Sequence, residues 1–315
     1  MGLIVFGIAQ IALGLLCLLM VGLMMLAQGM AARVNGAPTD TRTTIWVVVF
    51  YSAIAALFLS LGIGSMNCRR WARALTLILA WVWLGSGVLS VPILAIIMPR
   101  LLAETTRHGP ALPPGTLTLI LVIQMVFMTI LFIVIPGVLV LFYGSRHVKG
   151  TCETRDPARR WTDARPLPLL GVVIGLWVAG GLMPIFALIY RGAIPLFGTI
   201  LSGLPGVVAA LGMAALWFWI GVMWYRRRAI GWWALLGALL LLGISGVVTF
   251  SHHDLTELYR KMGYPEAQIK MISGYGIMSS KLMLWGSVIW LVPIMAYLIW
   301  VKRFFRPSLT PSQAF

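Results

Sequence analysis

The stretch "AALFLSLGIGSMNCRRWARALTLILAWVWLGSGV", residues 55–88, decides the fold, because two apolar runs flank one short basic turn within it. Residues 214–247 repeat this plan. "AAL" returns at 214–216 and "SGV" at 245–247, each 159 positions after its first occurrence, and Gly62 returns as Gly221 in the same register. Three matches without a gap predict an internal duplication. Since each half holds an even number of spans, we expect parallel repeats about an axis along the membrane normal.

Composition places the chain in a membrane. Hydrophobic residues make up 60% of it, charged residues only 10%, and the mean hydropathy is +0.96, whereas soluble domains carry about 25% charged residues. A helix needs about 20 apolar residues to cross a bilayer. Eight runs meet this requirement, at roughly 3–26, 45–65, 74–98, 117–143, 167–190, 205–225, 232–250 and 276–301. They show no period-two alternation, so we predict an all-α integral membrane protein with eight transmembrane helices.

These runs group into two four-helix units. The first is predicted over 1–150, a basic linker over 151–165, the second unit over 166–306 and a short tail over 307–315. Most of the 24 Lys and Arg fall in the segments on one side of the predicted membrane, including both termini. The positive-inside rule then places both termini in the cytoplasm of a plasma or inner membrane. The net charge of +16 is spread over short loops without a nucleic-acid-binding motif, so anionic lipid headgroups are the expected partner and nucleic acid is not.

Ionisable groups are nearly absent from the predicted spans. All eight Asp and Glu lie in loops, which argues against a carboxylate-based pump. Lys281 precedes 20 uncharged residues that already fill a bilayer, so it is expected to snorkel to the headgroups. The alternative is a lysine that faces the gap between the repeats and binds an anion there. Gln10 and Gln124 are two amides inside spans that need partners, and hydrogen bonds between helices are favoured over substrate binding for both.

The segment "RGAIPLFGTILSGLPG", 191–206, opens an apolar run too long for one membrane helix. A break is therefore predicted between Ser202 and Gly206, and Ser202, Gly203 and Gly206 are candidate ligand-binding positions. A broken segment could be re-entrant and line a site, since irregular backbone persists at membrane depth only where protein or water satisfies it. The favoured interpretation is an interfacial helix on the headgroups.

The polar segment "SHHDLTELYRKMGYPEAQIKM", 251–271, carries the only metal-like pattern that we find. His253 and Glu257, four positions apart, share a helical face and form a weak candidate for a zinc site. Asp254 with Glu257 also fits a helix N-terminal cap. Leu255, Leu258, Tyr259 and Met262 form an apolar stripe at helical spacing. We favour an amphipathic helical hairpin that rests on the bilayer or on a partner subunit, and we expect no metal and no other cofactor.

Small residues mark close helix contacts. Gly171, Gly175 and Ala179 follow one another at spacings of four, as do Gly206 and Ala210. No nucleotide, nucleophile or metalloprotease motif is present, so catalysis is not expected. The leading functional hypothesis is a non-enzymatic accessory, scaffold or assembly subunit that acts through helix packing and contacts other membrane subunits. The alternative is a transporter or flippase for an anionic or apolar amphiphile, with a site between the repeats that includes Lys281.

Overall fold

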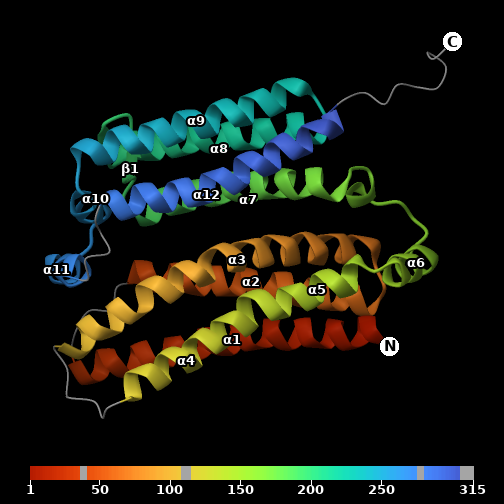
Figure 1. The fold of residues 1–315 in the computed structure, drawn as a ribbon, viewed down its shortest axis with the longest axis horizontal. Helices are drawn as coiled ribbons and strands as arrows, with labels where there is room; N and C mark the ends of the chain where they lie inside the picture. Colours follow the sequence, from red (N-terminus) through yellow and green to blue (C-terminus); the bar gives the residue numbers. More distant parts are fainter. Residues whose placement is uncertain (36–40, 108–114, 275–279, 306–315) are drawn as a thin grey trace. The chain divides into compact units, whose positions relative to one another are not determined.

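A computed structural model describes residues 1–35, 41–107, 115–274 and 280–305 (Figure 1). Helices in the first part of the chain are α1 (Gly2–Asn35), α2 (Thr41–Met66), α3 (Arg70–Arg107), α4 (Thr116–Thr129), the π-helix η1 (Ile130–Val134), α5 (Ile135–Gly144), α6 (Arg146–Arg155) and the 3-10 turn η2 (Trp161–Asp163). The second part comprises α7 (Leu167–Ile189), β1 (Ile194–Leu196), β2 (Thr199–Leu201), α8 (Leu204–Tyr225), α9 (Ala229–His252), α10 (Leu255–Met262), α11 (Glu266–Gly274), α12 (Ser280–Val301) and the 3-10 turn η3 (Lys302–Phe305).

Long apolar helices confirm the multi-pass membrane class. Seven candidate spans are found among the described residues, at Gly2–Met30, Thr44–Met66, Arg70–Pro99, Thr116–Gly144, Leu167–Ile189, Leu204–Tyr225 and Ala229–His252. They correspond in order to the first seven predicted runs. The eighth run coincides with the helix α12, although part of the predicted range, 276–279, lies outside the described residues.

The chain divides into two compact units. Unit 1 comprises Met1–Val91 and Ile123–Arg165, and unit 2 comprises Pro92–Val122 and Pro166–Phe315. In unit 1, α1 and α2 pack along glycines. A Cβ on Gly7 would meet the backbone of Gly62, and one on Gly14 would meet the backbone of Ala55, so both positions require the smallest side chain. The ring of Phe6 lies 4.2 Å from that of Phe142, which joins α1 to α5.

Pro136 explains the π-helical turn in the fourth span of unit 1. A proline has no N–H and its ring displaces the carbonyl four residues earlier, which is that of Phe132. The turn Ile130–Val134 widens to π geometry directly before it. The freed Phe132 carbonyl lies against Gly87 of α3, where a Cβ would overlap it. The disturbance at Pro136 is thus absorbed inside the helix, and a glycine on α3 accommodates it.

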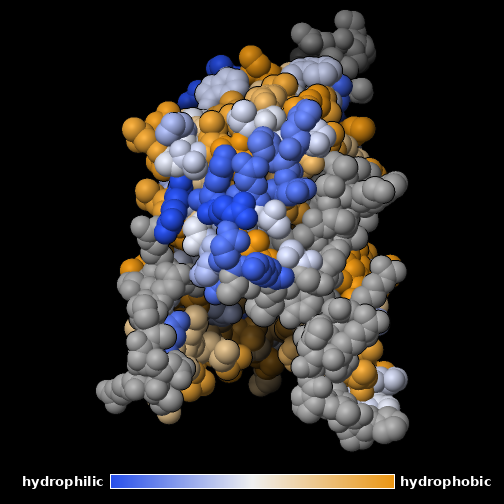
Figure 2. Space-filling view, turned by 90° about the vertical axis from the view of Figure 1, so that its left-hand side faces the viewer, coloured by the Kyte–Doolittle hydropathy of each residue, from blue (hydrophilic) through white to orange (hydrophobic). Residues whose placement is uncertain are grey.

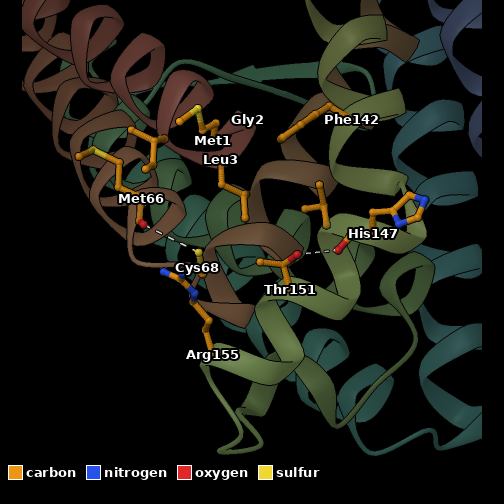
Figure 3. A pocket seen from close by; sticks show the side chains of 11 residues that line it. Met1, Gly2, Leu3, Met66, Cys68, Phe142, His147, Thr151 and Arg155 are labelled. Atoms are coloured by element: carbon orange, nitrogen blue, oxygen red, sulfur yellow. Dashed lines mark hydrogen bonds between the residues drawn. The ribbon is translucent and has the colours of Figure 1, made fainter.

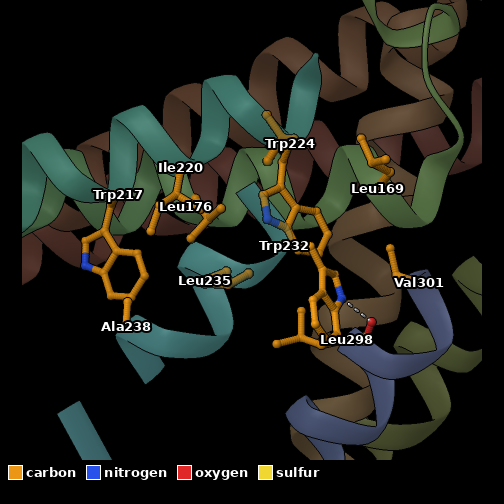
Figure 4. Close-up of a cluster of buried hydrophobic side chains, with 11 residues drawn as sticks. Leu169, Leu176, Trp217, Ile220, Trp224, Trp232, Leu235, Ala238, Leu298 and Val301 are labelled. Carbon is orange, nitrogen blue, oxygen red and sulfur yellow. Dashed lines mark hydrogen bonds between the residues drawn. The ribbon is translucent and has the colours of Figure 1, made fainter. Parts of the chain in front are cut away.

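The core of unit 2 is built around tryptophans (Figure 4). Buried side chains from α7, α8, α9 and α12 form one cluster, whose members include Leu176, Ile220 and Leu235, all labelled in Figure 4. Indole groups tie its helices together. Trp232 donates to the Leu298 carbonyl at 2.9 Å, which joins α9 to α12, and Trp224 donates to the Gly231 carbonyl at 2.8 Å, which joins α8 to α9.

The α2–α3 and α8–α9 turns have the same backbone geometry. Cys68 and Arg227, 159 positions apart, both adopt positive φ, at 52° and 55°. Three backbone hydrogen bonds close each turn, and they join equivalent positions: 67 to 63, 68 to 65 and 69 to 64 in unit 1, and 226 to 222, 227 to 224 and 228 to 223 in unit 2. The following helices then begin at equivalent residues, Arg70 and Ala229.

Candidate functional site

The segment 191–203, before the predicted break at Ser202 to Gly206, is a β-hairpin, which corrects the interpretation as an interfacial helix. β1 and β2 are antiparallel, with Pro195 opposite Ile200. The two-residue loop between them, Phe197 and Gly198, has φ of 42° and 81°, and positive φ at both positions defines the hairpin turn that matches strand twist. The protein is mostly helical as predicted, but the all-α prediction is corrected by this two-stranded hairpin. Strands of three residues are too short to leave a periodic signal in the sequence.

Two side chains of α9 and its C-cap residue, His253, hold the hairpin turn. The Ser245 hydroxyl accepts from Phe197 N–H at 2.8 Å, and the Thr249 hydroxyl accepts from Gly198 N–H at 3.0 Å. His253 Nε2 lies 3.0 Å from the Gly198 carbonyl. Because 245, 249 and 253 are four residues apart, they share a helical face. The sequence reasoning missed this device, although the spacing of a serine, a threonine and a histidine was the signal that could have found it.

His253 and Glu257 form a hydrogen-bonded pair that joins α10 to the end of α9. Their side chains meet at 2.7 Å between Nδ1 and Oε2, while Nε2 of the same ring faces the Gly198 carbonyl. Both ring nitrogens face acceptors, so only the imidazolium form, which carries two N–H groups, donates to both. This hydrogen bond lowers the pKa of Glu257, and Lys261 adds to the effect. No group of three metal-ligating side chains is found within the described ranges. The described residues thus place no third ligand beside this pair, and the zinc interpretation stays an untested prediction.

The apolar stripe of α10 packs on the hairpin of its own chain. Leu255 and Leu258 are buried with Ala193 and Ile200, and Tyr259 and Met262 pack against them. Lys261 Nζ donates to the Ile200 carbonyl at 2.9 Å and so joins the same two elements through polar atoms. The expectation that this stripe rests on the bilayer or on a partner is corrected. We call the hairpin and α10 together, residues 191–203 and 254–263, the cap.

Two further details of the cap differ from expectation. Asp254 stands at the N-cap position of α10 as predicted, but its side chain makes no capping hydrogen bond. Arg260 of α10 and Glu266 of α11 are exposed, and Figure 2 shows hydrophilic side chains gathered on the end of unit 2 that carries these helices. Arg260 and Glu266 pair there at 2.7 Å. That contact lowers the pKa of Glu266 and raises the pKa of Arg260.

Gly203 and Gly206 have backbone roles at the base of the hairpin. Gly203 adopts a φ of 66°, and its N–H donates to the Arg191 carbonyl at 2.6 Å. Gly206 lies against the carbonyl of Gly192, where a Cβ would overlap it. Ser202 is exposed beside them. The predicted start of the next helix is confirmed, since α8 begins at Leu204.

The predicted small-residue face of α7 is not where α7 meets α8. Gly175 and Ala179 are exposed, Gly171 is half-buried, and a Cβ on Gly175 would meet no atom within 4 Å. Gly180 makes the close contact, against the backbone of Ala214 and the ring of Phe218. Gly206 on α8 does make a close contact, but it packs against Gly192 at the base of the hairpin and not against another helix.

The remaining candidates are single residues. Gln124 of α4 is half-buried, with no hydrogen bond among the described residues. Lys281 is in the first turn of α12, but its side chain lies outside the described residues, so its predicted snorkelling and its alternative role both stay predictions.

A buried polar network satisfies Gln10. Its amide donates to the Thr76 hydroxyl at 3.2 Å and accepts from the Ser65 hydroxyl at 3.2 Å, and Tyr143 donates to Ser65 at 2.9 Å. The four residues come from α1, α2, α3 and α5, and each is at most 3% exposed. The predicted role of Gln10 between helices is confirmed. Ser65 and Tyr143 were missed, because no sequence pattern links residues this far apart.

The linker folds onto unit 1 through a buried carboxylate. Asp156, 3% exposed, pairs with Arg69 at 3.5 Å and with Arg160 at 3.6 Å, and it also accepts from the backbone N–H of Arg70. Burial of a carboxylate is tolerated only with such compensation. The chain itself therefore supplies one counter-charge to the basic turn of unit 1.

One shallow pocket of about 210 Å³ opens beside this linker (Figure 3). Its walls combine apolar groups such as Leu3 and Phe142 with Cys68, His147 and Arg155. Pockets for small-molecule ligands enclose about 300–1,000 Å³. This pocket falls below that range, and it brings together none of the predicted site residues.

No protein-family model, curated protein or solved structure matches the chain.

Proposed function

We propose that the protein is a non-enzymatic accessory or assembly subunit of a membrane, which acts by packing against other membrane subunits. One observation carries this proposal: the described polar groups most suited to chemistry are committed to holding the fold. His253 and Glu257 clamp the cap, and Gln10 joins three helices. Groups with all their hydrogen-bonding capacity engaged in the fold offer little to a substrate.

The proposed architecture is two tandem four-helix units with eight membrane spans. Support comes from the equivalent turns at Cys68 and Arg227 and from burial in the first helix of each unit. Four buried positions of α1 match four of the six buried positions of α7 at a shift of 166: Leu3, Gly7, Gln10 and Gly14 correspond to Leu169, Val173, Leu176 and Gly180. Both termini then lie on one side, which we assign to the cytoplasm of a plasma or inner membrane from the basic turns.

The proposed contact surface is the exposed small-residue face of α7 at Gly175 and Ala179. In lipid, helices associate by close approach of backbones, and small residues permit that approach. The α7–α8 contact uses Gly180 instead, so Gly175 and Ala179 stay available to another helix.

Site-specific photo-crosslinking in native membranes tests this function. A photoreactive residue at Gly175 or Ala179 is expected to capture a protein partner in high yield. The matched control is Leu188 of the same helix, which is 68% exposed and points in a different direction, and it should capture lipid. A chain that crosslinks to no protein at Gly175 or Ala179 would contradict the proposal. So would substrate flux by the purified protein alone in vesicles, which would support the transport alternative.

A further inference from the structure

The end of unit 2 opposite the cap carries cations from two segments. Arg226, Arg227 and Arg228 form the α8–α9 turn, and Lys302 and Arg303 belong to η3. All five are exposed. We call these five residues the basic end.

Aromatic contacts bring the two segments together. The Trp232 hydrogen bond to the Leu298 carbonyl joins the start of α9 to the last turn of α12, and the rings of Trp224 and Phe305 lie 4.9 Å apart. Trp224 and Trp232 flank the arginine turn in sequence. The cations of η3 are therefore held next to this turn by contacts on both sides of it.

The two cations of η3 lie on indole rings. Lys302 Nζ is 4.4 Å from the ring centre of Trp232 and 5.0 Å from that of Trp233, and the Arg303 guanidinium is 4.1 Å from that of Trp300. Cation–π contacts orient a cation without neutralising its charge. Tryptophans with lysine and arginine are also the side chains that anchor helices at the headgroup level of a bilayer.

The part of unit 2 from Pro166 onwards places no described carboxylate at this end. No Asp or Glu occurs in residues 164–253 or in residues 267–315. The acidic residues between these ranges, such as Glu257, belong to the opposite end, with the cap. The first turn of α9 adds to the positive potential, since it has no acidic residue and no side-chain cap.

The equivalent turn of unit 1 provides the contrast. There Asp156 of the linker pairs with Arg69 and Arg160 and accepts from the backbone of Arg70. The two turns therefore share their backbone geometry but differ in charge. The turn of unit 1 receives a counter-charge from Asp156, and the turn of unit 2 receives none from the described residues of unit 2.

We propose that the basic end of unit 2 binds the phosphate group of an anionic glycerophospholipid, which supplies the missing counter-charge. Arginine forks donate paired hydrogen bonds to phosphate oxygens, and lysine adds a point charge. The tryptophans flank the site and are suited to contact the glycerol and upper acyl region of the same lipid. This proposal requires only that unit 2 is embedded in a bilayer, and it does not depend on the scaffold function.

Native mass spectrometry of the full chain in mild detergent tests the proposal. Phosphatidylglycerol is the probe, and phosphatidylcholine is the zwitterionic comparison. The wild type should retain phosphatidylglycerol preferentially. The double variant Lys302→Gln/Arg303→Gln should weaken that binding by roughly tenfold or more, since each cation near a lipid surface contributes about a factor of five. Lys302→Gln alone gives a smaller loss in the same direction, should the double variant fail to fold.

The control variant Arg159→Gln/Lys270→Gln removes the same net charge from exposed positions outside the basic end. It should retain phosphatidylglycerol like the wild type. An equal loss in this control would overturn the proposal in favour of unspecific attraction by net charge. A competition arm identifies the ligand source. If inorganic phosphate or water-soluble glycerophosphoglycerol displaces the lipid at equal concentration, the site binds free phosphate and the lipid assignment is wrong.

Discussion

At the scale of single residues, the buried polar side chains and the glycines at close contacts serve packing. Gln10 is an example that the sequence predicted in kind but not in detail. A buried amide inside an apolar helix needs partners, and that much followed from the sequence. Its partners on three other helices could not be predicted, since they depend on how those helices rotate against one another.

Replacement of Gly206 by alanine should destabilise the protein, because the added Cβ would overlap the Gly192 carbonyl. Overpacking of this kind costs about 1–3 kcal/mol. Gly212→Ala in the same helix is the matched control, as a Cβ there would meet no atom within 4 Å. It should be neutral, or stabilising by up to about 1 kcal/mol. Thermal unfolding in detergent measures both, and equal midpoints for the two variants would show that the hairpin base is not closely packed.

The Tyr143 hydroxyl offers a second test at this scale. Tyr143→Phe removes the donor to Ser65 and leaves the ring in place, so we expect a loss of about 1 kcal/mol from the free energy of unfolding. Tyr51→Phe, at a position that is 36% exposed, should change this free energy by much less. Chemical unfolding in mixed micelles compares the two. A larger loss for Tyr51→Phe would contradict the network.

At the scale of elements, the cap was only partly predictable from the sequence. The excessive length of the apolar run after 191 predicted a break before Gly206, and α8 does begin at Leu204. The hairpin itself was not predicted, since its strands have three residues each and its turn is held by α9, more than 40 positions away. Likewise, the stripe of α10 gave a correct amphipathic helix, but its spacing carried no information about what covers it.

The cap should loosen in acid. The pKa of Glu257 is lowered in the folded protein, first by His253 and then by Lys261. A carboxyl with a lowered folded pKa stabilises the fold above its unfolded pKa, and this contribution disappears as the pH falls through the folded value. We therefore expect faster amide exchange in 194–201 as the pH falls below about 4.5, where this carboxylate becomes protonated.

Hydrogen exchange, corrected for intrinsic rates, measures this effect in purified protein. Glu257→Gln removes the titrating group, so its cap should exchange faster at neutral pH and respond less to acid. The hairpin contributes no titratable side chain between 192 and 203. A wild-type cap that stays equally protected at pH 3.5 would show that the His253–Glu257 contact does not hold it.

At the scale of the whole molecule, both units have a close contact between the two helices that flank the basic turn. The small and the large side chain of this contact have exchanged places between the units. Gly64 of α2 lies against Ala72 of α3, and at the equivalent positions Met223 of α8 lies against Gly231 of α9. The register of 159 positions was visible in the sequence for these helices. The shift of 166 that relates α1 to α7 was not visible, because two of the four matching buried positions differ in residue type, Gln10 against Leu176 and Gly7 against Val173.

This exchange makes a prediction about coupling. A Cβ on Gly231 would press against the Cβ of Met223, so Gly231→Ala alone should destabilise unit 2 by about 1–3 kcal/mol. Met223→Gly alone removes packing and adds a flexible glycine, so it should also be destabilising. The double variant recreates the glycine–alanine pair of unit 1. It should therefore be less destabilised than the sum of the single variants, with a coupling of about 0.5–3 kcal/mol in a double-mutant cycle. Additive effects would mean that the equivalent turns do not share an equivalent helix contact, and the proposed duplication would lose its best structural support.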